Sequence, residues 1–185
     1  MKHLLAFALL LASCAAPSQE QPREMAIPDP ARPVAPHPFL EQLVGDWSIE
    51  HRMAMGPEEE RLTMHARESV RAMGPWIVST IVSDGPMGHI EANLALAEDP
   101  DAPGEFHGTW VDSTAGTLWI YRGWLDDTGT MLTLEAEGPA FDDPTKTALY
   151  RDVTELLGDG HRALRSSVRM DGEWVAFVEG EARRN

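Results

Sequence analysis

Beyond residue 44, short segments rich in apolar residues are separated by Gly, Pro, Asp and Asn. The breaks recur at intervals of roughly 10 to 14 residues, a spacing typical of short antiparallel strands joined by tight turns. No long segment in this part has the period of an amphipathic helix. The rhythm therefore favours an all-β domain, built as a meander, a sandwich or a barrel.

The clearest strand pattern lies at 61–72. Apolar residues occupy nearly every second position there, and the positions between them are basic or polar; the apolar set is Leu62, Met64, Ala66, Val70 and Ala72. A period of two predicts a strand with one buried face. The segments 89–97 and 117–126 show the same alternation. Asp171-Gly172, between two such segments, is the strongest hairpin signal, and 125–130 predicts a second turn.

About ten strands are predicted in this way. They lie near 46–55, 61–72, 76–83, 88–97, 105–112, 117–126, 130–137, 147–157, 161–170 and 173–183. Residues 38–44 predict one or two helical turns before the first strand. Consecutive hairpin-linked strands close most simply into an antiparallel up-and-down barrel, because closure leaves no exposed edge. A two-sheet sandwich is the alternative that the sequence leaves open.

Residues 1–13 have the features of a secretory signal peptide. A short basic start precedes Leu4–Ala12, an apolar run too short for the about 20 residues of a membrane-spanning helix. Leu11-Ala12-Ser13-Cys14 matches the lipobox of bacterial lipoproteins, in which the cysteine is acylated. Cys14 is the single cysteine of the chain, and acylation would remove a free thiol from an oxidising compartment. An ordinary cleaved signal with an incidental cysteine is the alternative.

Residues 14–38 predict a linker, because they hold seven of the 14 prolines and few large apolar residues. Such a segment favours extended polyproline conformations and acts as a semi-rigid spacer. Ala15 after the cysteine resembles an outer-membrane sorting signal, so the expected location is the cell envelope, on the periplasmic side of the outer membrane. Residues 39–185 then form one domain.

The formal charge of −15, from 30 acidic and 15 basic side chains, argues against nucleic acid as a partner. Binding to phosphates requires a concentrated basic face. The same charge argues against the domain lying flat on anionic lipid, which leaves the lipid anchor as the expected membrane contact. Solubility at the envelope is the simplest role for the excess of acids.

Gly45-Asp46-Trp47 follows the predicted helix and opens the first strand. This placement resembles the Gly-x-Trp signature of lipocalins and their calycin relatives, whose tryptophan plugs the closed end of a barrel. In those families an arginine of the last strand packs on that ring, a role that Arg183 or Arg184 would fill.

A broader resemblance covers most of 39–185. The blocks FLEQLVGDW, FHGTWVDS, LWIYRGWLDDTGTMLTLEAEGP, YRDVTEL and DGEWVAFVEGEARR are similar, in order, to an uncharacterised bacterial family, domain of unknown function 1579. The resemblance implies a calycin-like barrel and no established activity. One departure is AEDPDAPGEF, which replaces the family's usual Gly-Tyr-Asp turn before the fifth strand.

The candidate ligand-binding residues are Trp110, Asp112, Trp119, Tyr121 and Arg151. The aromatic members are large amphipathic side chains that suit a mostly apolar pocket with a few placed polar groups. An alternative is that they are cross-strand packing pairs and that Asp112 with Ser113 caps a turn. Arg151 offers a bidentate fork for a ligand carboxylate, but only one of Tyr150 and Arg151 can face inward. An ion pair with a neighbouring strand is the other interpretation of Arg151.

The seven histidines form no metal-binding spacing, so no metal and no cofactor are expected. Haem held by His51 or His107 is an alternative. No nucleophile elbow or Gly-rich phosphate loop is present, so no catalytic residue is assigned. The leading hypothesis is a tethered barrel that binds a small apolar or amphipathic molecule. The alternatives are an enzyme with Asp112 or a histidine as general base, and a filled barrel that serves through partner contacts.

Overall fold

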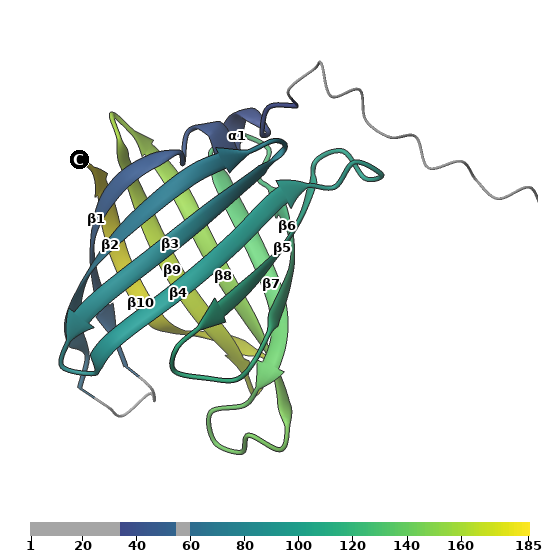
Figure 1. Cartoon of the computed structure of the whole chain (residues 1–185). Coiled ribbons are helices and arrows are strands. Elements are labelled where there is room, and N and C mark those ends of the chain that lie inside the picture. Colours follow the sequence, from purple (N-terminus) through teal and green to yellow (C-terminus); the bar gives the residue numbers. More distant parts are fainter. Residues whose placement is uncertain (1–33, 55–59) are drawn as a thin grey trace, which may run out of the picture. The chain divides into compact units, whose positions relative to one another are not determined.

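The computed structural model describes residues 34–54 and 60–185, and this part of the chain forms a closed β-barrel (Figure 1). The strands follow one another around the barrel in sequence order, all neighbours are antiparallel, and β1 closes the ring against β10. The predicted all-β fold is therefore confirmed as a barrel rather than a two-sheet sandwich. Cys14, the predicted signal peptide and residues 14–33 of the predicted linker lie outside the described residues.

Each predicted strand segment corresponds to one strand of the barrel. The strands are β1 (Gly45–Met53), β2 (Leu62–Met73), β3 (Trp76–Gly85), β4 (Gly88–Glu98), β5 (Glu105–Asp112), β6 (Trp119–Leu125), β7 (Met131–Pro139), β8 (Thr147–Gly158), β9 (His161–Met170) and β10 (Glu173–Arg184). The short helix α1 (Pro38–Glu41) precedes them. No helix within 34–54 and 60–185 is long and apolar enough to cross a membrane.

The two predicted turns form for the expected backbone reasons. Asp171 and Gly172 have φ angles of +50° and +87°, the positive values that a tight two-residue hairpin requires. At the β6–β7 turn, the Asp126 carboxylate accepts hydrogen bonds from the backbone N–H groups of Thr130 and Met131, at 3.0 and 2.9 Å. Both connections thus fix the pairing of the strands that they join.

Helix α1 closes one end of the barrel (Figure 1). His37 caps it, because its Nδ1 atom accepts the Phe39 backbone N–H at 3.1 Å. Phe39 and Leu40 are buried in the core that also holds Trp47. The Trp47 indole Nε1–H donates to the Leu43 carbonyl at 2.8 Å, so the ring is tied to the segment that leads out of the helix. This end is called the α1 end below.

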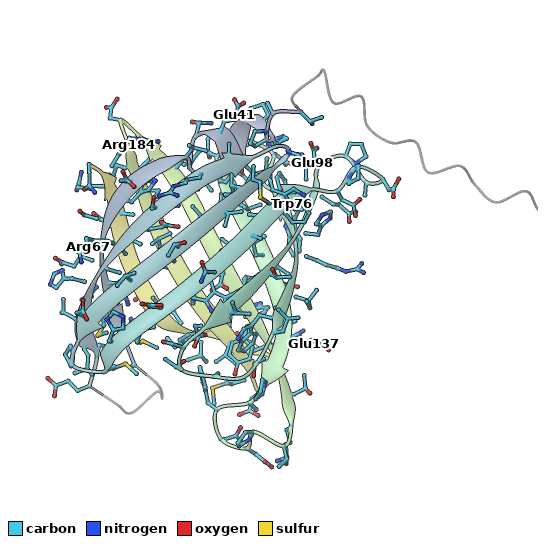
Figure 2. The ribbon with its side chains drawn as sticks, viewed as in Figure 1. Glu41, Arg67, Trp76, Glu98, Glu137 and Arg184 are labelled. Atoms are coloured by element: carbon cyan, nitrogen blue, oxygen red, sulfur yellow. The ribbon has the colours of Figure 1, made fainter. Side chains whose placement is uncertain are left out.

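Two arginines lie over the buried ring of Trp47. The guanidinium carbons of Arg184 and Arg162 lie 4.4 and 4.3 Å from the ring centroid, close enough for cation–π attraction. Arg184 also donates to the carbonyls of Gln42 and Val44, which fastens the last strand to the chain between α1 and β1. Figure 2 shows Arg184 at the α1 end. Of the two arginines considered from the sequence, Arg184 takes this position, whereas Arg183 pairs with Glu181.

Arg162 forms a buried ion pair inside the barrel. Its partner is Glu68, and the two residues, from β9 and β2, are only 4 and 6 % exposed. Ser79 Oγ donates to the other carboxylate oxygen of Glu68 at 2.6 Å. Glu68 and Arg162 are not on neighbouring strands, because β1 and β10 lie between β2 and β9 in the ring. The ion pair therefore spans the interior rather than a single strand ladder. A charged contact thus crosses the core beside Trp47.

We predict that Arg162→Met lowers the free energy of unfolding by about 3–5 kcal/mol, because it leaves the Glu68 carboxylate buried without a counter-charge. The double variant Glu68→Met/Arg162→Met should recover most of this loss, since no charge then remains in the core. Urea denaturation of the two single variants and the double variant measures the coupling.

Arg165→Met is the matched control on the same strand. Its side chain is 62 % exposed and pairs with Glu179 at the surface, so its loss should change stability by less than about 1 kcal/mol. Equal losses from Arg162→Met and Arg165→Met would contradict a special role for the buried pair.

Candidate functional site

Four of the five predicted ligand-binding residues face the barrel interior on adjacent strands. Trp110 and Asp112 alternate inward on β5, and Trp119 and Tyr121 do so on β6. Trp110 lies directly opposite Trp119 in the ladder. The four side chains gather toward the end of the barrel opposite α1, called the far end below.

Arg151 lies on the outer face of β8, apart from those four residues. Its Nε and Nη2 atoms both donate to Glu135 Oε1, at 2.9 and 2.6 Å, and its guanidinium carbon lies 3.9 Å from the Trp174 ring centroid. The inward positions of β8 belong instead to its neighbours Tyr150 and Asp152, because adjacent strand residues point to opposite faces. The structure therefore shows the ion pair with a neighbouring strand that was the other interpretation of Arg151.

Asp112 organises the end of β5. One carboxylate oxygen accepts the Thr114 and Ala115 backbone N–H groups at 2.8 and 3.2 Å, and the other accepts the Trp110 indole N–H at 3.0 Å. Burial alone would raise the pKa of the Asp112 carboxyl, but hydrogen bonds from Thr114, Trp110 and the backbone outweigh it and lower the pKa. Asp112 is thus an ionised turn cap that also orients the Trp110 ring.

A second carboxylate, Asp152, lies inside the barrel and was not singled out from the sequence. The Tyr121 hydroxyl donates to Asp152 Oδ2 at 2.5 Å, and Ser166 lies directly opposite Asp152 on β9, where its hydroxyl acts to lower the pKa of that carboxyl. Burial raises the pKa of the Asp152 carboxyl, and the two hydroxyls offset only part of that effect. Burial and the neighbouring Asp152 charge together raise the pKa of Tyr121 well above its ordinary value. The sequence could have indicated this position, because alternation along the predicted strand 147–157 places Asp152 on the same face as Tyr150.

Trp119, Phe141, Tyr150 and Phe177 form an aromatic cluster, and its member Tyr150 lies two residues before Asp152 on the inner face of β8. Its rings meet edge to face, with centroids 4.9 Å apart for Trp119 and Tyr150 and 5.1 Å apart for Phe141 and Phe177. Edge-to-face geometry is the favourable arrangement for aromatic pairs. Phe141 belongs to the β7–β8 loop, so that loop folds its aromatic ring onto the interior at the far end.

The ladder between β6 and β7 stops short beside this cluster. The paired residues run only from Arg122–Glu135 to Leu125–Leu132, whereas β7 continues to pair with β8 as far as Pro139. The Trp119 ring lies over the backbone of Gly138, where any Cβ atom would overlap it. The Trp119 ring therefore occupies the space that a side chain at position 138 would need, so this packing requires a glycine there.

Burial varies within the barrel interior. Inward residues near α1, such as Trp47, Ile77 and Phe106, are fully buried. Toward the far end some inward side chains are buried as well, namely Met64, Ala92, Tyr121, Tyr150 and Val168. Others there are half-buried, namely Trp110, Trp119, Asp152, Ser166 and Phe177. Solvent therefore reaches part of the far half, along β5, β6, β8, β9 and β10.

The two candidate haem histidines lie on different faces. His107 is on the outer face of β5, where its ring contacts Trp76 at a centroid distance of 5.1 Å. His51 is on the inner face of β1, and burial together with nearby His65 lowers its pKa. No group of three or more His, Cys, Asp or Glu residues suited to a metal ion occurs within the described part of the chain.

Two features mark the outside of the barrel. An open groove of about 1010 Å³ runs over β1, β10, β9 and β8. Its charged residues largely neutralise one another, as in the Arg165–Glu179 pair at 3.2 Å. On β5 and β6 and between them, an exposed apolar patch is formed by Val111, Leu118, Ile120 and Trp124.

We predict that Gly138→Ala displaces the Trp119 ring and lowers the free energy of unfolding by about 1–3 kcal/mol, the usual cost of overpacking. Gly116→Ala is the control, because a Cβ atom there would meet nothing within 4 Å. Urea denaturation measures both effects. A Gly138→Ala variant as stable as the Gly116→Ala variant would show that the ring is free to move aside.

Comparison with known proteins agrees with the resemblance noted above. None of the curated proteins matches the chain. The family model described as "Protein of unknown function (DUF1579)" matches residues 32–184, which include α1 and all ten strands of the barrel. The chain belongs to the DUF1579 family.

Proposed function

We propose that the barrel binds a small amphipathic molecule in its far half. The observation that carries this proposal is that three inward-facing aromatic side chains there, Trp110, Trp119 and Phe177, are only half-buried, whereas Trp47 and Phe106 near α1 are fully buried. Sites for small molecules are mostly apolar and contain a few fixed polar groups. Trp110, Trp119 and Phe177 would supply the apolar lining, and Tyr121 with Asp152 the polar end. Arg151 has no part in this site, because it lies outside.

Trp119→Leu should weaken binding of a neutral fluorescent probe, N-phenyl-1-naphthylamine, by about tenfold or more, since it removes a central aromatic contact. The probe is titrated into the full chain and its fluorescence is followed. Trp124→Leu is the matched control, because Trp124 is on the same strand and 43 % exposed on the outer face. Equal weakening by both substitutions would argue for surface binding, and no binding to the wild type would count against the proposal.

Native mass spectrometry of the full chain, purified from its own host, complements the probe. A bound mass would give the chemical class of the natural ligand, and an absorbance spectrum of the same sample tests haem at His51. A barrel that is empty in repeated preparations would favour the partner-binding alternative, for which the exposed patch around Ile120 and Trp124 is the supporting observation.

A second candidate function is an enzyme that acts on the bound molecule. Asp152 supports it, because a carboxyl group with a raised pKa inside a binding site is suited to general acid–base chemistry. The same mass measurement separates the two functions. An enzyme would release a chemically altered compound, and Asp152→Asn would stop the change while binding persisted; a binding protein would return its ligand unchanged.

We further propose that Cys14 is acylated and tethers the barrel to the envelope. The lipobox and the single cysteine support this, with the proline-rich segment 14–38 as the spacer. Cells grown with an alkyne analogue of palmitate should label the wild-type chain, and Cys14→Ser should abolish the label and release the chain into the soluble fraction. Undiminished labelling of Cys14→Ser would refute the assignment. Osmotic-shock and membrane fractionation would test the outer membrane as the location.

A further inference from the structure

We propose that the molecule bound in the far half is an organic cation, a protonated amine on an apolar body, whose ammonium group Asp152 holds among the aromatic side chains. This inference rests on the proposed binding function and adds the chemical class of the ligand. It is carried by the charges that face inward, by the partners of Asp152 and by the aromatic rings around it.

The charged side chains that face inward in the far half are acidic. Strand alternation places Asp112 and Asp152 on the inner face, and Glu173 lies on the same side at the rim. In the described residues, the inward-facing arginines are Arg162 and Arg184, and both are engaged at the α1 end. Arg122, Arg151, Arg165 and Arg169 occupy outward positions of their strands. An anionic ligand would therefore meet only like charges in the far half.

Asp152 has hydroxyl partners and no cationic partner among the described residues. Tyr121 donates a hydrogen bond to it, and the Ser166 hydroxyl lies on the opposite residue of β9. An ionised carboxylate has room for about four such bonds, so lone pairs remain for a ligand. Asp152 is half-buried, and a charge that is partly removed from water without a counter-charge is costly. A bound ammonium group would supply that counter-charge and favour the ionised form, against the burial that raises the pKa of Asp152.

The aromatic side chains suit the same ligand. Trp110 and Trp119 lie opposite each other on β5 and β6, and Trp119 packs against Tyr150, which Phe177 also contacts. Aromatic faces attract cations, and the attraction grows when the cation is shielded from water. The other titratable groups on the inner face of the described strands are Tyr121, Tyr150, the turn cap Asp112, Glu173 at the rim, Glu98 and Arg184 at the α1 end, the paired Glu68 and Arg162, and His51, whose lowered pKa keeps it neutral near pH 7. None of these groups supplies a positive charge beside Asp152.

Isothermal titration calorimetry of the full chain with octylammonium, octanoate and 1-octanol at pH 7 tests the inference, since the three probes share one apolar chain. Octylammonium should bind at least about tenfold more tightly than octanoate and more tightly than octanol. Asp152→Asn should remove that preference while leaving the affinity for octanol within about twofold. Asp142→Asn, at an exposed acid of the β7–β8 loop, is the control for general attraction by acidic side chains and should leave the preference intact.

Each other outcome overturns the inference. Octanoate or octanol binding as tightly as octylammonium would refute the cation while leaving the binding function in place. Binding of the neutral naphthylamine probe without any of the octyl compounds would do the same, whereas failure of all four probes would remove the binding function as well. An equal loss of preference in Asp142→Asn and Asp152→Asn would assign the effect to surface charge. If Asp152→Asn does not fold, the affinities of the wild-type chain for octylammonium, octanoate and octanol still decide whether the site prefers a cation.

Discussion

The contact of Trp47 with Arg162 and Arg184 is the interaction on which the closure of the barrel depends. The indole is 1 % exposed and bonded to Leu43, so it connects the chain after α1 to the first strand. Arg184 brings the last strand to the same point, and Arg162 extends the contact through Glu68 into β2. The first and last strands of the ring therefore meet at one buried ring. A hydrophobic core alone would not specify this closure, because apolar contacts are not directional.

The half-buried part of the interior lies away from this contact. α1 covers the end where the two arginines are neutralised or hydrogen-bonded, and large apolar side chains such as Ile77, Leu96 and Phe106 fill the space beneath it. At the far end the β7–β8 loop contributes Phe141, and the inward Trp110, Trp119 and Phe177 are only half-buried. Asp152 and Ser166 lie among these half-buried positions rather than in the apolar core beneath α1, where polar groups without partners would be costly.

Much of this could be predicted from the sequence, because strand alternation and turn residues act locally. The period of two in 61–72 and the Asp171-Gly172 turn identified strands and hairpins, and the inward grouping of Trp110, Asp112, Trp119 and Tyr121 follows from the same parity. What alternation could not supply is contact between distant positions. Glu68 interrupts the apolar face of its strand, and its partner lies 94 residues away. Only the closed ring brings them together. Asp152 reaches Tyr121 across β7, the strand between theirs, and alternation along a single strand does not show that contact either.

Asp152 illustrates why the chemistry of the site depends on which face of a strand is buried rather than on a motif. In the sequence it is one of 30 acidic residues and sits in a strand whose most noticeable member is Arg151. Strand alternation places Arg151 on the outer face with Glu135 and Trp174 and Asp152 on the inner face, so the strand divides its opposite charges between the two faces. The interior then holds an acid separated from the nearest basic residue of its own strand. A carboxylate kept apart from cations in an aromatic surrounding is costly to a protein that has no use for it, and this cost is the physical reason to look for a ligand there.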